Sequence, residues 1–317
     1  MPITLNKDSI NFGNYSISLH PNGIEIDGKF KYASSEVPPT PTQAQGSVSG
    51  YVSGGGNPVV NIIEKFPFST DTNSSDVGDI TQARRYVAGQ SSSVSGYTSG
   101  GQPNLNTIDK FPFAADANAT DVGDLTQGRY GQTGQSSTTS GYNSGGQNPE
   151  RNTIDNFPFA ADANATDVGD ISFARYYNAG HSSTENGYIS GGGSAPTLLN
   201  NIDKFPFAVN ANSTDVGDLT QARQTLVGQN SITHGYASGG SVLPRTIIEK
   251  FPFSTDANAT DVGDLTITGV DASQSSTKSG YTTHGITIDK FPFAADANAT
   301  DVGDLTSARL VPAGQQV

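Results

Sequence analysis

The sequence has no cysteine and no tryptophan, and a single methionine in 317 residues. Without cysteine, disulfides and thiolate metal sites are excluded. No apolar run approaches the roughly 18 residues of a membrane-spanning helix, so we expect no membrane insertion. The N-terminus, residues 1–10, lacks the basic start and apolar stretch of a secretory signal. We therefore expect synthesis in a cytoplasm, without a signal peptide.

Positive charge is also scarce. The chain has 17 Lys and Arg against 30 Asp and Glu, which gives a net charge of −13. A nucleic-acid ligand requires a basic surface that displaces counterions, and an anionic membrane attracts basic segments. Neither is therefore an expected partner. Hydrophobic residues make up only 33%, which suits small stacked units that share their packing surfaces.

What the sequence does contain is a repeat of about 45 residues, present six times. The tyrosines of its Gly-Tyr dipeptide are spaced by 46, 45, 46, 48 and 45 residues and are Tyr51, Tyr97, Tyr142, Tyr188, Tyr236 and Tyr281. A Phe-Pro-Phe triplet follows each tyrosine, and an Asp-Val-Gly-Asp tetrapeptide follows each triplet. Six units in register over about 270 residues indicate one repeat architecture.

Each unit reads as four short strands separated by Gly pairs and by Asn/Asp clusters. In the third unit we expect them at residues 134–137, 139–144, 153–159 and 166–174. On the third strand of the second unit, Ile108 faces one side of the sheet, while Phe111 and Phe113 face the other. A sheet covered on both faces is typical of a propeller blade between two neighbours. The sequence thus predicts an all-β, six-bladed propeller over residues 44–317. A β-solenoid is the rival architecture.

The chain ends favour a closed ring over a solenoid. Residues 313–317 and 45–49 both resemble the first-strand motif, so one terminus is expected to supply a missing strand. We favour the N-terminal stretch as the strand that completes the last blade, with residues 311–317 as the competitor.

Two features of the unit resemble the kelch repeat. They are the Gly-Tyr-x-Ser-Gly-Gly stretch, in which the tyrosine and glycine pair close the second strand, and the Leu-Thr-x-Ala-Arg end. The fourth strand of kelch repeats usually carries a tryptophan, which this chain lacks. The resemblance implies a kelch-like propeller.

The amino-acid sequence of the repeats is also similar to that of repeats in virion structural proteins of marine tailed bacteriophages. The likeness covers about residues 44–317 and includes the Phe-Pro-Phe triplet and the Asp-Ala-Asn-Ala-Thr-Asp-Val-Gly-Asp loop. It implies that the chain is an appendage, tail-fibre-like or other structural component of a virion.

The two faces of the predicted propeller differ in sequence. The loops between third and fourth strands are nearly identical in every unit, whereas the 2–3 loops and the 4–1 loops vary. Because binding usually occurs on loops that a rigid scaffold positions, the varied face is the predicted recognition surface; unselected drift is the alternative explanation. The candidate ligand-binding residues there are Arg85, Tyr86, Tyr130, Arg151, Tyr176, Tyr177 and Arg245.

The uniform 3–4 loops suggest a metal. They hold 17 of the 30 acidic residues, in the spacing Asp-x-Asn-x-Thr-Asp-x-x-Asp that resembles the calcium loops of integrin-type propellers. No other cofactor is expected. The alternative is that these residues form Asx turns that cap the hairpin. The candidate calcium ligands are Asp116, Asn118, Thr120, Asp124, Asp162, Asn164, Asp170, Asp256, Asn258, Asp264, Asp296, Asn298 and Asp304.

No catalytic constellation is recognisable, so we expect a protein that is not an enzyme. The four histidines have no metal-ligand spacing, and the repeated carboxylates read as scaffold. Residues 1–36 lie outside the repeat and read as short strands that are too few for a stable core of their own. They are therefore predicted to form a β attachment or oligomerisation segment. A proline-rich linker at residues 37–43 follows.

These features together predict a non-enzymatic phage virion structural protein. Its residues 1–36 would dock to other virion proteins, and its propeller would present a face to a host-surface glycan or to another virion protein. A homo-oligomer is a further possibility. The alternative function is that of a soluble kelch-like protein–protein interaction adaptor.

Overall fold

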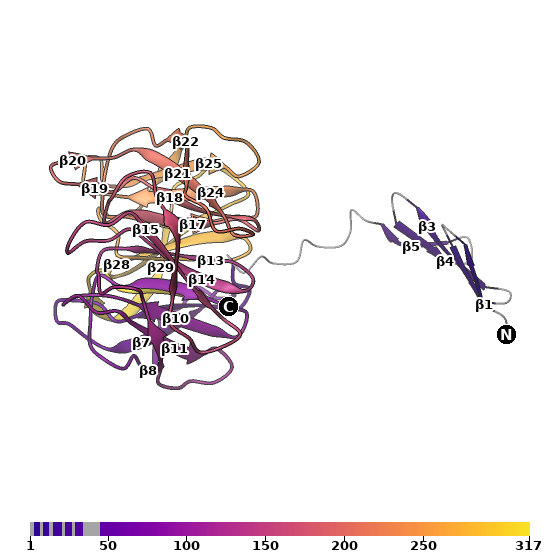
Figure 1. The fold of residues 1–317 in the computed structure, drawn as a ribbon, viewed down its shortest axis with the longest axis horizontal. Coiled ribbons are helices and arrows are strands. Elements are labelled where there is room, and N and C mark those ends of the chain that lie inside the picture. The colour runs from indigo at the N-terminus through magenta and orange to yellow at the C-terminus, as the bar shows by residue number, and fades with distance from the viewer. Residues whose placement is uncertain (1–2, 7–8, 13–14, 21–22, 27–28, 34–44) are drawn as a thin grey trace. The chain divides into compact units, whose positions relative to one another are not determined.

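A computed structural model of the chain describes residues 3–6, 9–12, 15–20, 23–26, 29–33 and 45–317. The chain divides into two compact units, Met1–Thr40 and Pro41–Val317 (Figure 1). The first unit is one antiparallel sheet whose strands pair in chain order: β1 (Ile3–Asn6), β2 (Ser9–Phe12), β3 (Tyr15–His20), β4 (Gly23–Ile26) and β5 (Lys29–Ala33). The predicted linker at 37–43 lies outside the described residues.

The second unit is the predicted six-bladed β-propeller, and the described residues contain strands but no helix. No helix that could span a membrane therefore occurs among them. Blade I contains β6 (Ser49–Ser53), β7 (Ile62–Pro67) and β8 (Ser75–Asp79). Blade II contains β9 (Ala88–Ser91), β10 (Ser95–Ser99), β11 (Thr107–Pro112) and β12 (Thr120–Asp124). Blade III contains β13 (Thr133–Ser136), β14 (Ser140–Ser144), β15 (Thr153–Pro158) and β16 (Thr166–Asp170).

The other three blades vary this plan. Blade IV contains β17 (Ala179–Ser182), β18 (Asn186–Ser190), β21 (Asn201–Pro206) and β22 (Thr214–Asp218), with a small hairpin of β19 (Gly193–Ser194) and β20 (Thr197–Leu198) in its 2–3 loop. Blade V contains β23 (Leu226–Asn230), β24 (His234–Gly239), β25 (Ile247–Pro252) and β26 (Thr260–Asp264). In blade VI, β27 (Ala272–Ser275) is followed by β28 (Ser279–Pro292), which covers the second- and third-strand positions, and by β29 (Thr300–Arg309).

The expected four strands of the third unit are present, but the fourth is shorter than predicted. Strand β16 ends at Asp170 rather than at 174. The residues that follow leave the sheet and turn inward, so that Ile171 and Arg175 are both buried.

The prediction that the N-terminal stretch completes the last blade is wrong. Strand β30 (Ala313–Gln316) pairs with β6 and supplies the first strand of blade I, with Gln315 opposite Tyr51. The stretch at 45–48 makes only a single parallel bridge, between Gly46 and Ser276. The first-strand motif is Gly then Gln, as in Gly314-Gln315, whereas the N-terminal stretch reads Gln45-Gly46. Reversing the two residues puts a side chain at a position where five of the six first strands have glycine.

Tyrosine and phenylalanine rings form the core between neighbouring blades. Tyr97 stacks on Phe159 at 4.9 Å and lies 5.4 Å from Phe157, both in the next blade. The same arrangement recurs six times and closes the ring where Tyr281 stacks on Phe68. Ile108 and the two phenylalanines lie on opposite faces of the sheet, as predicted. The structure adds that Ile108 packs toward blade III, whereas Phe111 and Phe113 pack toward blade I.

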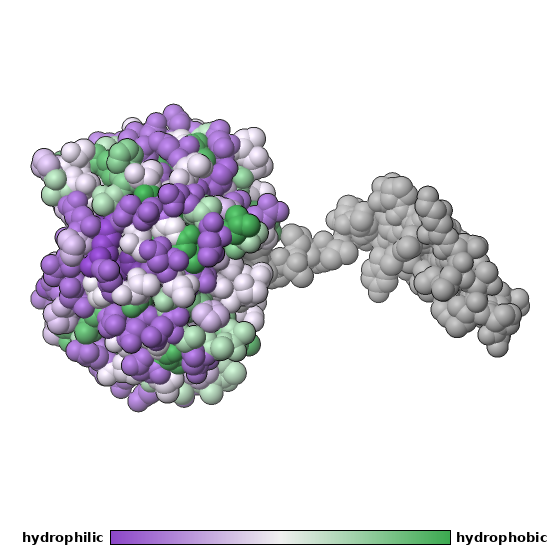
Figure 2. All heavy atoms as spheres, viewed as in Figure 1, coloured by the Kyte–Doolittle hydropathy of each residue, from purple (hydrophilic) through white to green (hydrophobic). Residues whose placement is uncertain are grey.

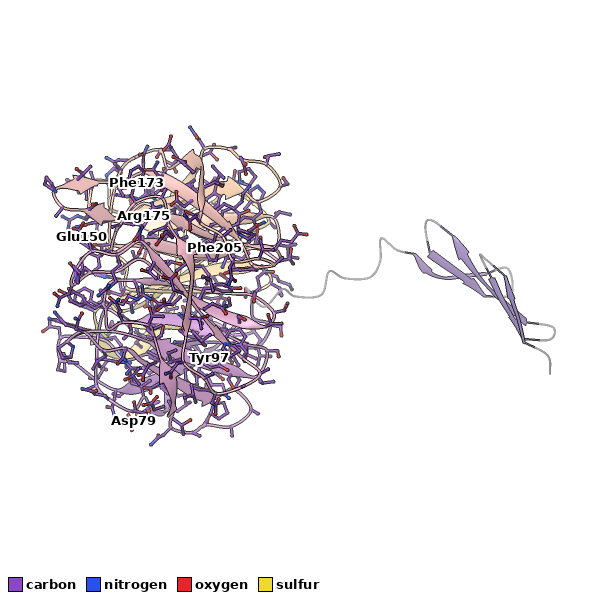
Figure 3. The ribbon with its side chains drawn as sticks, viewed as in Figure 1. Asp79, Tyr97, Glu150, Phe173, Arg175 and Phe205 are labelled. Atoms are coloured by element: carbon purple, nitrogen blue, oxygen red, sulfur yellow. The ribbon has the colours of Figure 1, made fainter. Side chains whose placement is uncertain are left out.

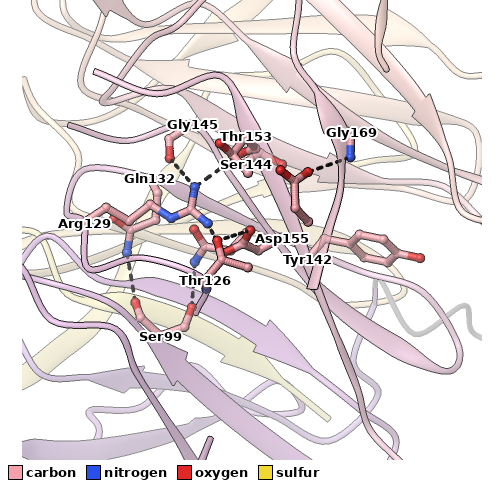
Figure 4. A network of polar contacts seen from close by, with 12 residues as sticks. Ser99, Thr126, Arg129, Gln132, Tyr142, Ser144, Gly145, Thr153, Asp155 and Gly169 are labelled. Carbon is pink, nitrogen blue, oxygen red and sulfur yellow. Dashed lines mark hydrogen bonds and ion pairs between the residues drawn. The ribbon is translucent and has the colours of Figure 1, made fainter. Parts of the chain in front are cut away.

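A buried ion pair joins most neighbouring blades as well. Arg129 meets Asp155 of the next blade, and both side chains are fully buried (Figure 4). Asp155 also accepts hydrogen bonds from the backbone and the hydroxyl of Thr126, at 3.0 and 2.7 Å. Equivalent pairs lie at four other interfaces: Arg84–Asp109, Arg175–Asp203, Arg223–Glu249 and Arg309–Glu64. Breaking one of these pairs is costly, because a buried charge that loses its partner destabilises the fold by about 3–5 kcal/mol.

The interface between blades V and VI lacks the arginine. Asp289 occupies the acidic position and is as buried as its equivalents, but the preceding loop reads Ile267-Thr268-Gly269. Asp289 keeps the two hydrogen bonds from Thr266, at 2.8 and 2.6 Å. No ion pair to it occurs among the described residues. The ring is therefore irregular at one interface.

Candidate binding face around the channel mouth

The six first strands surround a narrow central channel, whose cavity measures about 140 Å³. Glycines allow the strands to approach so closely: a Cβ atom on Gly134 would lie 2.1 Å from the carbonyl oxygen of Gly89 in the preceding blade. A ligand pocket usually has about 300–1,000 Å³. The channel is therefore smaller than an ordinary ligand pocket, and a larger ligand has to bind at its mouth.

The mouth on the varied face is a circle of backbone hydrogen bonds. The residue two positions after each buried arginine occupies it, and we call these the mouth positions: Tyr86, Gly131, Tyr177, Thr225 and Val311. Four of the amides donate to the carbonyl of the preceding mouth position at 2.6–3.1 Å: Thr225 to Tyr177, Tyr177 to Gly131, Gly131 to Tyr86 and Tyr86 to Val311. The fifth amide, that of Val311, donates to the Asp271 carboxylate at 3.0 Å. The five loops therefore share one backbone geometry.

That geometry is left-handed. The φ angle is 68° at Gly131, and Tyr86, Tyr177, Thr225 and Val311 adopt 57°, 54°, 59° and 50°. Only glycine takes this conformation freely; another residue loses about 1–2 kcal/mol, and β-branched residues such as Thr225 and Val311 are rare there. Gly131 has the residue that this backbone favours, and it also leaves room for the Tyr177 ring, which would lie 2.7 Å from a Cβ atom there. Four side chains are therefore kept in spite of strain, which is typical of functional sites.

A second set of positions, one residue earlier, ties each 4–1 loop to the next blade. We call these the rim positions: Arg85, Tyr130, Tyr176, Gln224 and Leu310. Their carbonyls accept hydrogen bonds of 2.7–2.9 Å from the 2–3 loop of the neighbouring blade, at Gln102, Gln147, Gly193, Ser241 and Gly56. Rim and mouth together form a rigid surface on which the backbone is constant and the side chains vary.

Tyrosines gather on one part of this surface. The ring of Tyr86 lies 5.9 Å from that of Tyr130 and 5.2 Å from that of Tyr177, which is 5.0 Å from Tyr176. We call these four residues the tyrosine cluster. Burial and the neighbouring Tyr86 raise the pKa of Tyr177 above its usual value, so its phenol stays protonated. The Gln147 amide donates to that phenol oxygen at 2.7 Å.

Arg85 borders the tyrosine cluster and is held from three sides. Its guanidinium lies 5.3 Å from the centre of the Tyr86 ring, and its Nε donates to Gln102 at 2.8 Å. Its Cδ lies against the backbone of Gly56, where a Cβ atom would come within 2.6 Å. Neither Nη group has a hydrogen-bond or ion-pair partner among the described residues.

The structure thus brings together five of the seven predicted ligand-binding residues: Arg85, Tyr86, Tyr130, Tyr176 and Tyr177. Arg151 and Arg245 belong to the same face but to the 2–3 loops of blades III and V, and neither contacts the tyrosine cluster in the described structure. Another 2–3 loop residue, Glu150, lies beside the β19–β20 hairpin and accepts hydrogen bonds from Ser194 and Ala195 (Figure 3).

Sequence reasoning missed one polar pair on this face. The Nδ1 atom of His284 lies 2.8 Å from the carboxylate of Asp271, which also accepts from the backbone amides of Gly285 and Val311. The bond to Asp271 raises the pKa of His284. Asp271 replaces a backbone carbonyl in the mouth circle, because the loop of unit V is one residue shorter than the others. That missing residue was the visible signal in the sequence.

Two of the candidate calcium ligands in these loops, the first Asp and the Asn, have partners within the protein. The first Asp of a 3–4 loop pairs with a lysine of the preceding blade at 2.5–3.5 Å, in five pairs: Lys65–Asp116, Lys110–Asp162, Lys204–Asp256, Lys250–Asp296 and Lys290–Asp71. The Asn two residues later accepts from a backbone amide of that blade, as Asn118 does from Asp79 at 3.0 Å. No group of three His or acidic side chains in the described part of the chain is arranged to hold a metal ion.

The sequence itself supports this assignment. In the sixth pair, between blades III and IV, Asn156 stands where the others have lysine and Asn210 where they have aspartate. Lysine and aspartate are thus lost together. A metal site would need the aspartate whether or not a lysine is present. In an ion pair, by contrast, neither residue has a function once its partner is absent.

The buried histidine His181 takes the place of a glutamine. Gln135, its equivalent in blade III, accepts from Ser144 and donates to the carbonyl of Tyr188, at 2.9 and 3.3 Å. The neutral imidazole reproduces this pattern, since Ser190 lies 2.8 Å from Nε2 and the Gln229 carbonyl 3.4 Å from Nδ1. Burial lowers the pKa of His181 to about 4. The residue is a structural substitute with no open side for a substrate.

Comparison of the chain with protein-family models and with curated proteins finds no match.

Proposed function

We propose that the chain is a non-enzymatic structural protein of a phage virion, an appendage, fibre or tail component. In this proposal the N-terminal unit docks to other virion proteins. The kelch-like propeller presents its varied face to a host-surface glycan or to another virion protein.

One observation carries the binding part of the proposal. Rim and mouth positions hold a constant backbone, and four mouth positions keep a strained side chain where the backbone favours glycine. Drift in unselected loops would favour glycine at these positions, because the strain costs about 1–2 kcal/mol for each residue. Selection for what the side chains contact explains their presence.

The non-enzymatic part rests on the character of the polar groups. The channel of about 140 Å³ offers no substrate-sized cavity. The buried carboxylates recur from blade to blade as partners of arginine, and His181 is enclosed. The virion setting rests on the similarity of the repeats to phage structural proteins and on the separate N-terminal unit.

Particle association tests the proposal directly. The full chain should sediment with virus particles in a density gradient and stay with them through high-salt washing. A chain without residues 1–36 should be lost from the particles, while a Tyr177→Ala variant should remain bound but fail to label bacterial cells. Recovery of the full chain only from the soluble fraction would refute the virion role.

The second candidate is a soluble kelch-like interaction adaptor. The tyrosine cluster and Arg85 favour it, because Tyr and Arg are the residues that dominate protein–protein contacts. An adaptor would be recovered free in the soluble fraction, bound to a cellular protein through the same face.

A further inference from the structure

The positive charges of the propeller are distributed unevenly. Of the lysines and arginines in the described residues 45–317, five lysines pair with aspartates of the 3–4 loops and five arginines are buried in ion pairs between blades. The remaining four are Arg85, Arg151, Arg245 and Lys278. The three arginines all lie on the varied face, and Lys278 lies in a 1–2 loop on the uniform face.

Negative charge has the opposite distribution. The uniform 3–4 loops carry 17 acidic residues, whereas the varied loops carry Glu150 and Asp271. Both of these are already engaged, Glu150 with the β19–β20 hairpin and Asp271 with His284 and two amides. Although the net charge of the chain is −13, one face of the propeller thus has arginines that are not paired with an acidic residue in the described structure. An anionic ligand is attracted to that face and repelled from the other.

Arg85 is built as an anion contact. Its stacking on Tyr86, its bond to Gln102 and its packing on Gly56 fix the guanidinium while both Nη groups stay unpartnered in the described structure. A guanidinium binds a carboxylate through two parallel hydrogen bonds. Because Arg85 is already ordered, little side-chain entropy is lost when the ligand binds.

The tyrosine cluster supplies the other half of the contact. Its rings are half-buried and pack against one another, so they offer a fixed apolar surface with phenol groups at its edges. The protonated Tyr177 phenol accepts a hydrogen bond from Gln147 and also interacts with the Tyr86 phenol, so hydrogen-bonding groups line the edge of the cluster. An apolar surface edged by donors matches a sugar ring, which has an apolar face and hydroxyls around its rim. Elsewhere on the propeller, the side in view in Figure 2 is mostly hydrophilic, with small hydrophobic patches between.

We propose that Arg85 and the tyrosine cluster bind a carboxylate-bearing sugar of an acidic polysaccharide. The sugar ring stacks on Tyr86 and its neighbours while the carboxylate meets the Nη groups of Arg85. The inference rests on the proposed function, since it names the glycan class that the varied face takes.

Affinity electrophoresis of the full chain through gels that contain alginate, a polymer of uronic acids, tests this. Alginate should retard the wild-type chain, and neutral dextran should not. Arg85→Gln and Tyr177→Ala should each weaken alginate binding about tenfold, a loss of about 1.4 kcal/mol. Lys278→Gln removes the same charge from the uniform face, away from the tyrosine cluster, and should bind as the wild type does.

Three results would overturn the inference: no retardation by alginate, equal retardation by alginate and dextran, or equal weakening by Arg85→Gln and Lys278→Gln. Equal weakening would show that the chain binds any polyanion through its overall charge. In that case a parallel gel that contains dextran sulfate should retard the chain more strongly than the alginate gel does. Circular dichroism of each variant confirms that the fold is intact. If alginate fails while the chain still sediments with virus particles and labels cells through Tyr177, the proposed function stands and only the ligand class is wrong.

Discussion

His181 makes the stability of the propeller sensitive to acid. The side chain is fully buried and neutral in the folded protein, where its pKa is about 4. In the unfolded chain a histidine has its usual pKa of about 6.5. As the pH falls below that value, His181 binds a proton in the unfolded chain but not in the folded chain. The free energy of unfolding therefore decreases between about pH 6.5 and pH 4.

The size of the effect follows from the two pKa values. One pKa unit corresponds to about 1.36 kcal/mol, so at pH 5 the cost is about 2 kcal/mol. His181→Gln restores the residue that occupies the equivalent position in the other five blades. The variant should therefore be about 2 kcal/mol more stable than the wild type at pH 5, relative to the difference between the two proteins at pH 8.

Urea unfolding followed by tyrosine fluorescence measures this, since the chain has 12 tyrosines and no tryptophan. The mirror variant Gln135→His is the matched control, because it places the same buried histidine in blade III and should add a second acid-sensitive step of similar size. If His181→Gln changes stability equally at pH 5 and pH 8, His181 is not buried as a neutral donor–acceptor pair and the account of the inner strands is wrong.

Two other predictions concern the contacts between blades. Asp155→Asn leaves the buried Arg129 without its partner and should lower the free energy of unfolding by about 3–5 kcal/mol. Asp289→Asn, at the interface that lacks an arginine, should change it by less than about 1 kcal/mol. Equal effects of the two variants in calorimetry would contradict the assignment of the ion pairs. EDTA should leave the melting temperature unchanged, because the 3–4 loops are held by Lys–Asp pairs and Asn side chains; a clear fall on chelation would revive calcium.

The repeat made the fold predictable, and the limits of the prediction have physical causes. The period and the two-sided apolar pattern of Ile108 and Phe111 depend only on local sequence, and both are confirmed. The choice of closing strand depends on packing across the ring. Gly314 fits because a Cβ atom there would meet the carbonyl oxygen of Ser273 at 2.0 Å, a contact that no single unit reveals.

The candidate binding site was also predictable only in part. Variation among the loops predicted which face is the candidate binding surface, because binding residues and drifting residues both depart from the repeat. It did not identify which residues meet, since Arg85 and Gln102 come from different blades and Arg151, though equally variable, lies apart. The left-handed backbone at Tyr177 is likewise invisible in sequence. The sequence also did not show that the first aspartates of the 3–4 loops pair with lysines about 50 residues away, as Asp162 does with Lys110.

The central claim is that the mouth positions keep side chains for binding rather than for stability. Tyr177→Gly tests it most directly, with unfolding free energy and cell labelling measured on the same protein. Relief of about 1–2 kcal/mol of strain offsets the chain entropy of glycine, about 0.5–1 kcal/mol, and the lost ring contacts, about 0.5–1.5 kcal/mol. Stability should therefore stay within about 1 kcal/mol of the wild type while labelling is lost. A variant that is several kcal/mol less stable but labels cells as the wild type does would contradict the claim.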